Sequence, residues 1–274
     1  MSTYKNDSPD HLDRAIQSVW EDQYEKPDEI ILVVDGPVSK RTKKILDKYR
    51  TVIGNNFKIV YQEKNLGLGA TLNNGVEYCN CEFIARMDAD DISLPNRFFL
   101  QKRFLKENPD IAVLGGSIKE FDEDGNQYCR KFPADTEEIK NEIPKGSPFA
   151  HPAVMIKREI FKDVAYTETT SKSIDKIVVG NEDIALWFEI IKRGYKVANL
   201  DQSILKYRKN HSFFDRRSKN KSFSEFKIYW EGTLALHGFS YRLIFPLLRL
   251  ASRHMPRVIN KFLYSQRSLV FKSS

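Results

Sequence analysis

The sequence predicts an α/β fold: a mostly parallel sheet flanked by helices, followed by a basic helical extension at the carboxyl end. The first observation is that strand-like and helix-like segments alternate through roughly the first hundred residues, which is typical of a parallel sheet with crossover helices. The second is an ordinary globular composition, with 41% hydrophobic and 30% charged residues in a chain of 274. The third is charge: residues 206–274 hold 15 Lys and Arg against 3 Asp and Glu, whereas the rest of the chain is mildly acidic.

A buried parallel strand is expected at Glu29–Val34, because a run of apolar and mostly β-branched residues occurs there. The helix before it is expected from His11 to about Trp20, with Ser8 or Asp10 as its amino-terminal cap. The alternation then continues along the chain. Further elements are expected at Lys40–Tyr49 (helix), Phe57–Tyr61 (strand), Ala70–Tyr78 (helix), Glu82–Met87 (strand) and Pro95–Lys106 (helix).

The second half of the chain follows a different pattern. Short strands around turns are expected between Ile111 and Phe132, as a β-meander or a strand-rich insertion. The apolar spacing predicts a helix at Asn181–Arg193, which Gly194 ends. The remaining expected elements are strands at Tyr195–Leu200 and Ser203–Arg208 and basic, aromatic helices beyond Ser222.

Cysteine content and hydropathy indicate in which cellular compartment the protein is expected. Cys79, Cys81 and Cys129 are odd in number, and their spacing fits neither a disulfide framework nor the usual zinc site. The sequence shows no signal-peptide pattern and no apolar run of roughly 18 residues. A reducing cytosol is therefore the expected location, and the basic tail indicates an anionic partner.

Three carboxylates crowd into Asp88-Ala89-Asp90-Asp91, directly after the strand expected at Glu82–Met87. Side chains alternate along an extended chain, so Asp88 and Asp90 are expected to point to the same side. Oxygen ligands of this kind suit Mn²⁺ or Mg²⁺, which commonly bridge carboxylates to substrate phosphates. The alternative is an acidic loop in which Asp91 or Ser93 caps the next helix.

Two other acidic positions and one histidine are candidates for chemistry. Asp35, before Gly36 at a strand end, is placed to accept hydrogen bonds from a base or ribose, and a plain turn is the alternative. Asp183, after Glu182 at a helix start, is a candidate general base, and favourable charge at a helix amino end is the alternative. His211 is a candidate metal ligand or diphosphate contact, and a structural histidine is the alternative.

Short motifs follow one another over about residues 1–211. They are Ser2–Lys5, Ile31–Pro37, Asn65–Asn73, Ala85–Asp91, Pro95–Arg97, His151-Pro152, Glu182–Trp187 and Tyr207-Arg208. In this order they resemble the motifs of family-2 glycosyltransferases, in particular bacterial enzymes of surface polysaccharide assembly such as O-antigen and exopolysaccharide synthesis. The resemblance implies a GT-A fold and an inverting, Mn²⁺- or Mg²⁺-dependent transfer of a sugar from a nucleotide-sugar donor, expected to be a UDP-sugar.

The same resemblance implies roles for matched positions. Thr3, Tyr4, Asp35 and Asn65 would line the nucleotide pocket. Asp88 would contact the ribose or metal side of the donor, and Asp90 would hold the metal with His211 as a further ligand. Asp183, in the pair Glu182-Asp183, would deprotonate the acceptor hydroxyl.

Domain boundaries and partners follow from this comparison. We expect a catalytic domain at residues 1–211, with nucleotide-sugar binding in about 1–110 and the acceptor side in about 111–211, and a basic helical extension at 212–274. The chain lacks the Gln-x-x-Arg-Trp motif of processive synthases, so one sugar is expected per encounter. The extension is expected to rest on the anionic inner face of a bacterial membrane, near a polyprenyl-diphosphate-linked acceptor.

One departure from the family and two alternative functions complete the expectations. The family places a buried strand before its Ser/Thr-x-Tyr segment, so we expect an apolar strand upstream of Met1. A nucleotidyltransferase is the alternative enzyme, although its Gly-rich basic loop is missing around Lys5–Ser8. A nucleic-acid-binding module would explain the basic tail but not the acidic body, so no nucleic-acid partner is expected.

Overall fold

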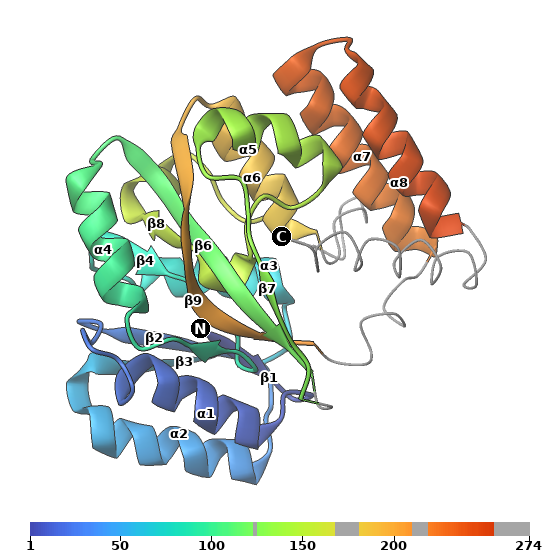
Figure 1. Ribbon diagram of the computed structural model, residues 1–274. Coiled ribbons are helices and arrows are strands. Elements are labelled where there is room, and N and C mark those ends of the chain that lie inside the picture. Colours follow the sequence, from blue (N-terminus) through green and yellow to red (C-terminus); the bar gives the residue numbers. More distant parts are fainter. Residues whose placement is uncertain (123–124, 168–180, 210–218, 255–274) are drawn as a thin grey trace.

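The computed structural model describes residues 1–122, 125–167, 181–209 and 219–254, arranged as two sheets with helices around them (Figure 1). The first sheet has three parallel strands in the order β1 (Ser2–Tyr4), β2 (Ile30–Asp35) and β3 (Phe57–Tyr61). Helices α1 (Pro9–Trp20) and α2 (Lys40–Ile53) lie on one side of it, and α3 (Leu68–Glu77) packs against β2. The parallel sheet predicted for this half is confirmed.

Local sequence signals explain these elements. Every residue of β2 is buried, as the apolar run predicts. The Ser8 side chain accepts a hydrogen bond from the backbone N–H of His11, so Ser8, rather than Asp10, is the cap of α1. Ser2–Tyr4 itself forms the edge strand beside β2, and the strand expected upstream of Met1 stays a prediction.

The second sheet is antiparallel except for one pair of strands. Its order is β4 (Phe83–Ala85), β8 (Met155–Lys157), β6 (Ile111–Phe121), β9 (Lys196–Arg208) and β5 (Ile92–Ser93), and β7 (Gln127–Arg130) pairs with β6. Only β6 and β9 run parallel. The prediction of a parallel sheet is therefore wrong for β4, whereas the β6–β7 hairpin agrees with the β-meander expected between Ile111 and Phe132.

Chain connections explain the difference in strand direction. The link from β6 to β7 is too short for a parallel crossover, which needs a dozen or more residues, so the two strands form a hairpin. The two strands expected at Tyr195–Leu200 and Ser203–Arg208 are one strand, β9. The pairing of β9 with β6 shifts register near Gly116 and Ser117 of β6, which is where the first expected strand of β9 gives way to the second.

The other helices are α4 (Arg97–Glu107), α5 (Thr136–Glu142), α6 (Glu182–Lys192), α7 (Lys219–His237) and α8 (Ile244–His254). Pro95 was expected in the first turn of α4, but it lies before the cap residue Asn96. Short 3₁₀ segments occur at Gly54–Asn56, Ile143–Lys145, His151–Ala153, Arg158–Lys162 and Tyr241–Leu243.

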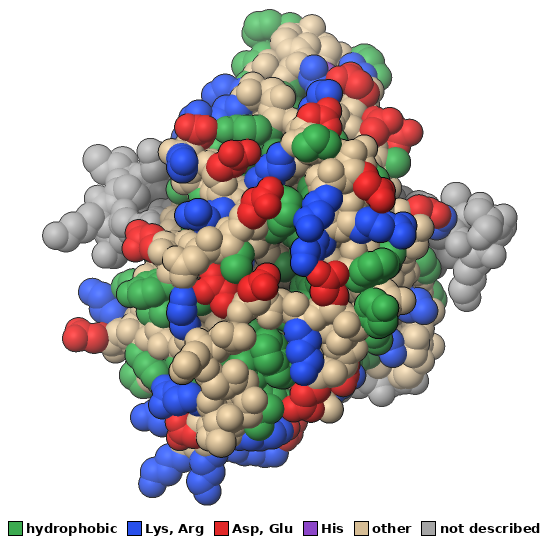
Figure 2. All heavy atoms as spheres, turned by 90° about the vertical axis from the view of Figure 1, so that its left-hand side faces the viewer, with side chains coloured by type: hydrophobic (Ala, Val, Ile, Leu, Met, Phe, Trp, Pro, Cys, Tyr) green, Lys and Arg blue, Asp and Glu red, His purple; other side chains and the backbone are tan. Residues whose placement is uncertain are grey.

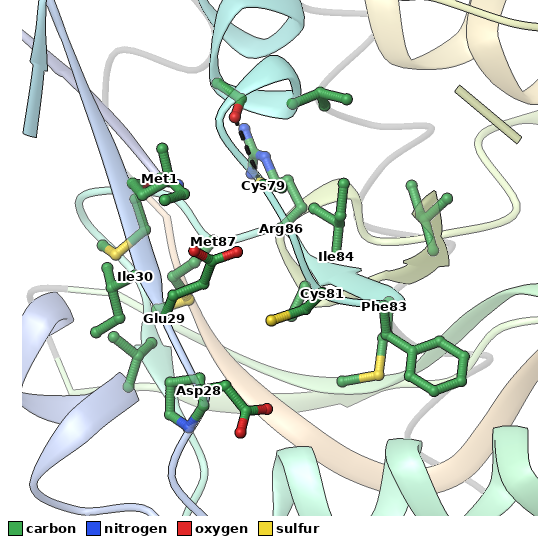
Figure 3. A pocket seen from close by; sticks show the side chains of 18 of the residues that line it. Met1, Asp28, Glu29, Ile30, Cys79, Cys81, Phe83, Ile84, Arg86 and Met87 are labelled. Atoms are coloured by element: carbon green, nitrogen blue, oxygen red, sulfur yellow. Dashed lines mark hydrogen bonds between the residues drawn. The ribbon is translucent and has the colours of Figure 1, made fainter. Parts of the chain in front are cut away.

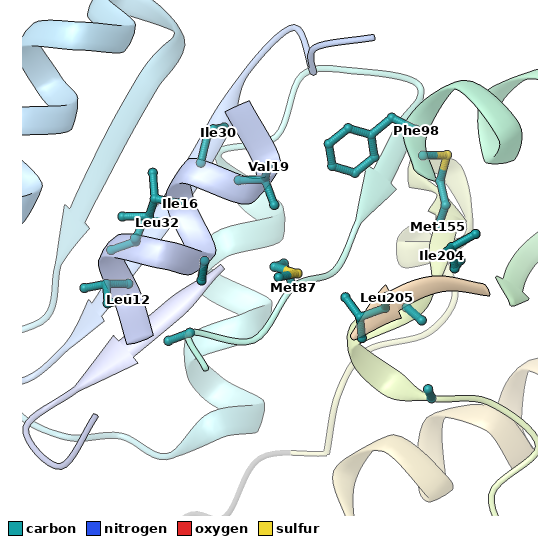
Figure 4. Packing of buried hydrophobic residues seen from close by; sticks show 14 of the residues in the cluster. Leu12, Ile16, Val19, Ile30, Leu32, Met87, Phe98, Met155, Ile204 and Leu205 are labelled. Carbon is teal, nitrogen blue, oxygen red and sulfur yellow. The ribbon is translucent and has the colours of Figure 1, made fainter. Parts of the chain in front are cut away.

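Two hydrophobic cores hold the molecule together. The first joins the two sheets: Figure 4 shows side chains of α1 and β2 packed toward residues from the second half of the fold, such as Phe98, Met155 and Leu205. The second surrounds α6, whose Trp187 is fully buried with its ring centroid 5.0 Å from that of Phe149. The predicted apolar positions of α6 are all buried. Their packing holds the helix in place, including its first residues, Glu182 and Asp183.

The carboxyl-terminal extension is attached to α6. The Tyr229 ring of α7 meets the Phe188 ring edge-on at 5.7 Å. At Gly232 any side chain would meet the same ring, because a Cβ there would lie 2.4 Å from it. Helix α7 therefore packs on the helix that begins with Glu182.

The three cysteines are free, so no disulfide staples the fold. Within the described residues, no helix combines the length and the apolar character that crossing a bilayer requires.

Candidate active site

An acidic cluster lies in the loop between β4 and β5. Carboxylate oxygens of Asp88, Asp90 and Asp91 lie within 4.8 Å of one another. Asp88 and Asp90 are partly exposed, whereas Asp91 is buried. The sequence predicted this group, and the structure confirms that it comes together.

Arg208, the last residue of β9, fixes this loop. Its backbone N–H donates to Asp91 Oδ1 at 2.8 Å, and its Nε donates to the backbone carbonyl of Asp90 at 2.9 Å. The idea that Asp91 or Ser93 caps a helix is wrong, because α4 begins only at Arg97. The contact with Arg208 spans more than a hundred residues of sequence, so no local signal reveals it.

Burial and mutual repulsion act together in the cluster. Burial raises the pKa of Asp91 well above its usual range, and the charges of Asp88 and Asp90 raise it further. The pKa of Asp90 is also raised, first by burial and then by Asp88. Because Asp91 Oδ2 is buried without a protein partner, the cluster suits a divalent cation, which would satisfy that oxygen and offset the repulsion.

Arg86 is a second arginine in direct contact with the cluster. Its guanidinium is buried and forms an ion pair with Asp88. Its Nε and Nη1 atoms are also buried and have no hydrogen-bond partner. The N–H groups on these two nitrogens have no acceptor within the described residues, and the sequence alone did not single them out.

Arg97 holds the acidic loop after β4 through hydrogen bonds to backbone carbonyls. It is fully buried, and its Nη2 donates to the backbone carbonyl of Arg86 at 2.7 Å and to that of Val154 at 3.3 Å. Its Nε donates to Gln101 at 3.1 Å. Burial lowers the pKa of Arg97 to about 9. The motif Pro95–Arg97 thus contributes a scaffold for the acidic loop.

Replacing Arg97 with alanine should lower the free energy of unfolding by about 3–5 kcal/mol, because a buried cavity forms and two backbone carbonyls lose their donor. Urea denaturation measures this change. Arg103→Ala is the matched control, since Arg103 lies on the same helix with its side chain 59% exposed, and its effect should stay within about 0.5 kcal/mol. Equal effects of the two substitutions would refute the scaffold role.

Asp35 and Asn65 meet at the end of β2. Asp35 Oδ1 accepts from the Leu66 backbone N–H at 2.7 Å, and Oδ2 accepts from Asn65 Nδ2 at 2.8 Å and from the Gly67 N–H at 3.2 Å. Gly36 makes this approach possible, because it has φ +83° and a Cβ there would lie 2.8 Å from the Asn65 nitrogen. Asp35 therefore organises the loop after β3, a role that the sequence did not reveal.

Thr3 and Tyr4 belong to the same region. In β1, Thr3 is paired with Val34 and Tyr4 with Asp35. The Thr3 side chain is buried, whereas Tyr4 is exposed. The structure thus brings together all four residues that were expected to line a nucleotide pocket.

Asp183 lies in the first turn of α6 and is partly exposed. Burial by the surrounding protein raises its pKa to about 6, and the neighbouring charge of Glu182 raises it further, while the Ile184 N–H and Arg86 act in the opposite direction. Glu182 itself is buried, and its Cγ faces Gly69 of α3. Of the two carboxylates, Asp183 is the one open to a substrate.

Arg86 links the two acidic groups electrostatically. Its charge lowers the pKa values of Asp90, Asp91 and Asp183, so it lies within reach of both the cluster and the α6 carboxylate. An acidic cluster that could hold a divalent cation and a carboxylate of raised pKa therefore share one region of the molecule, an arrangement suited to group transfer on a phosphorylated substrate.

Comparison with known proteins identifies this arrangement. The sequence profile described as "Glycosyl transferase family 2" matches residues 1–165. The chain belongs to glycosyltransferase family 2. Family membership makes this protein a glycosyltransferase, as predicted, and decides against the nucleotidyltransferase alternative.

Relatives of this glycosyltransferase match along nearly the whole chain. It is 32% identical over 268 residues to the amylovoran biosynthesis glycosyltransferase AmsE of Erwinia amylovora, covering 97% of both chains. It is 30% identical over 275 residues to an Escherichia coli enzyme named UDP-Gal:alpha-D-GlcNAc-diphosphoundecaprenol beta-1,3-galactosyltransferase, covering 97% of this chain and 94% of that one.

Solved structures show the same fold. S. aureus TarS in complex with UDP-GlcNAc superposes with a TM-score of 0.62 at 17% identity, covering 92% of this chain and 71% of TarS. The mannosyltransferase PcManGT from Pyrobaculum calidifontis, in complex with GDP-Man and Mn²⁺, superposes with a TM-score of 0.58 at 13% identity, covering 98% and 78%. The GT-A architecture that the resemblance implied is confirmed.

Of the two histidines that the sequence singled out, the structure describes His151 but not His211. His151 is buried, its Nε2 lies 3.1 Å from the Tyr166 hydroxyl, and burial lowers its pKa well below the usual range. His151 is therefore neutral and part of the core. His211, the candidate metal ligand, lies outside the described residues.

A cavity of about 310 Å³ lies beside the acidic cluster (Figure 3). Met1 and Ile30 line one side, Phe83 and Ile84 the other, and Arg86 lies at one end. None of the acidic cluster lines it, so the cluster, rather than this apolar space, is the candidate active site. Strands β1 and β4 are edge strands of their sheets, and the cavity lies between Met1, next to β1, and Phe83 and Ile84 of β4.

Proposed function

We propose that this glycosyltransferase transfers one hexose at a time from a UDP-sugar to a lipid-linked saccharide, with inversion and with Mn²⁺ or Mg²⁺, in bacterial polysaccharide biosynthesis. The observation that carries the proposal is the carboxylate cluster within 4.8 Å, in one region with a carboxylate whose pKa is about 6. The relatives' names support the substrates: AmsE acts in amylovoran biosynthesis, and the E. coli enzyme uses UDP-Gal and a diphosphoundecaprenol-linked acceptor.

The nucleotide half of the site is assigned to about residues 1–110. Thr3, Tyr4, Asp35 and Asn65 would hold the base and ribose there. The Asp35 carboxylate accepts three N–H groups, and since a carboxylate has about four acceptor sites, one remains for a base or ribose donor. Asp88 would face the ribose and the metal.

Asp88 and Asp90 would hold the metal, with the unpartnered Asp91 oxygen close by. Bound there, a divalent cation offsets the charge that develops on the leaving nucleoside diphosphate. The N–H groups on Nε and Nη1 of Arg86 would add hydrogen bonds to the same negatively charged donor. His211 remains a candidate further ligand.

Asp183 would act as the general base from the acceptor side, at about residues 111–211. Its carboxylate takes the proton of the acceptor hydroxyl as that oxygen forms a bond to the anomeric carbon. The bond from the anomeric carbon to the diphosphate oxygen breaks on the opposite face. Attack and departure on opposite faces invert the configuration of the sugar.

The pH dependence of kcat/KM should report the pKa of Asp183. A general base works when ionised, so activity should be retained above about pH 6 and fall about tenfold per pH unit below it. An aspartate with an unperturbed pKa near ~4 would keep full activity down to about pH 5. A profile that stays flat to pH 5 would contradict the assignment.

A donor screen tests the proposed function. Purified protein, Mn²⁺ and an acceptor extract are incubated with UDP-, GDP- and dTDP-sugars, and the released nucleoside diphosphate is measured. We expect a UDP-hexose to react fastest. Release from none of the donors would refute sugar transfer, and release of pyrophosphate from nucleoside triphosphates would indicate nucleotidyl transfer instead.

We place the enzyme in the cytoplasm, at the inner face of a bacterial membrane, without a nucleic-acid partner. Proteins that bind nucleic acid gather Lys and Arg on one face. On the face shown in Figure 2, acidic and basic side chains are interspersed. A lipid-linked acceptor supports the membrane location, because its sugar is presented at the lipid surface.

A further inference from the structure

Helix α8 carries its apolar side toward solvent. Ile244, Leu247, Leu248 and Ala251 follow the spacing of one helical face, and all four are exposed. In a surface helix that completes a core, this face would be turned inward. Here it is turned outward, on a hairpin that lies at the edge of the molecule (Figure 1).

Arg249 and Arg253 lie on the side of α8 that packs on the protein, together with the buried Pro246. Arg249 Nη1 and Arg253 Nη2 both donate to Glu225 of α7, at 2.9 and 2.8 Å. Arg249 also donates to the Lys145 carbonyl at 2.7 Å and lies over the Tyr229 ring at 4.3 Å. Because the Glu225 side chain is buried, these contacts fix the orientation of α8.

The turn before α8 extends the exposed apolar surface. Phe239 is 93% exposed and Tyr241 is 73% exposed, and both lie in the short segment between α7 and α8. We call Phe239, Tyr241, Ile244, Leu247 and Leu248 the α8 patch. Contiguous apolar surfaces of this kind mark sites where proteins meet other proteins or membranes.

Charge decides between these partners. The charged residues at positions 238–254 are Arg242, Arg249 and Arg253, and Glu225 offsets one of their charges, so α8 and the turn before it keep a net positive charge. Two copies of the chain that met through this patch would bring like charges together, which opposes a symmetric dimer. An anionic lipid surface would attract this net charge, and each excess positive charge near the surface would raise the partition coefficient about fivefold.

We propose that the α8 patch inserts into the headgroup region of an anionic bilayer and holds the enzyme on it. The inference deepens the proposed function, because a lipid-linked acceptor lies on such a surface. Aromatic and leucine side chains buried at the headgroup boundary, with basic residues around them, are the features of an interfacial helix. The arrangement also corrects the expectation that all helices after residue 222 rest on the membrane, since α7 packs on α6.

Vesicle flotation with the full chain tests the inference. Vesicles of phosphatidylcholine and phosphatidylglycerol in equal parts are compared with vesicles of phosphatidylcholine alone, at low salt. Wild-type protein should float with the anionic vesicles. Leu248→Glu should lower the partition coefficient about tenfold or more, because one inserted leucine is lost and a negative charge is added. Val52→Glu is the matched control, since Val52 on α2 is 52% exposed and Leu248 is 57% exposed, and it should float like wild type.

The outcomes separate the possible partners of the patch. If wild-type protein does not float, or if Leu248→Glu floats equally well, the inference is wrong. If light scattering shows a dimer that Leu248→Glu dissociates, the patch is a contact between copies and the inference is also wrong. Release of nucleoside diphosphate from the same preparations in detergent is measured separately, so that failure of the proposed function is distinguishable from failure of membrane binding.

Discussion

Replacing Asp90 with asparagine should lower turnover about a thousandfold or more, because a metal ion contributes several kcal/mol of transition-state stabilisation. The neutral amide removes one anionic ligand and leaves the remaining carboxylates with weaker affinity for the cation. The fold should persist, since the Asp90 side chain is partly exposed and the backbone carbonyl, rather than the carboxylate, holds Arg208. Turnover is measured as nucleoside diphosphate release over a series of Mn²⁺ concentrations.

Two comparisons make this result specific to the metal. Asp110→Asn is the matched control, because Asp110 is an exposed aspartate whose partner is Lys196, and it should keep nearly wild-type turnover. EDTA should abolish the activity of the wild-type enzyme, and excess Mn²⁺ should restore it. Full activity in EDTA would show that the cluster does not work through a metal.

Replacing Asp183 with asparagine should lower turnover by ~10²–10⁴, the usual contribution of a general base. An amide cannot take the acceptor proton, yet it fills the same volume and keeps the acceptor oxygen that faces the Ile184 N–H. Donor binding, measured by calorimetry, should therefore stay close to wild type. A loss of turnover with intact donor binding is the signature of the chemical step.

Glu189→Gln is the control for this second substitution. Glu189 lies on the same helix and pairs with Arg193 and Lys192 near the surface, so its loss should leave turnover unchanged. Near-wild-type turnover of Asp183→Asn would contradict the assignment. Glu182→Gln would then be the next variant to measure, although Glu182 is buried against α3.

Local sequence patterns predicted the elements well. The strand Phe57–Tyr61 has the predicted bounds, and α1, α2 and α6 begin within a few residues of the expected positions. These elements follow from properties of neighbouring residues: apolar runs, helical spacing and caps such as Ser8. The acidic cluster was predictable for the same reason, because its three aspartates lie within four positions of one another.

Contacts between distant segments were not predictable. Arg208 at the end of β9 binds Asp91 just before the neighbouring strand β5, and Arg97 binds the carbonyl of Val154. Strand direction in the second sheet depends on which strands become neighbours, and the apolar pattern of a strand is the same for either direction. The role of Asp35 in holding the loop after β3 likewise arises only when the two strand ends meet.

Helix α8 illustrates the difference between what the sequence determines and what the tertiary structure decides. The sequence by itself determined that the segment around Ile244, Leu247 and Leu248 is rich in large apolar residues interrupted by arginines. Only the tertiary structure decided that the apolar face is the outer one. The physical reason is that Glu225 of α7 is buried and needs cationic partners, so Arg249 and Arg253 turn inward and carry the leucines outward.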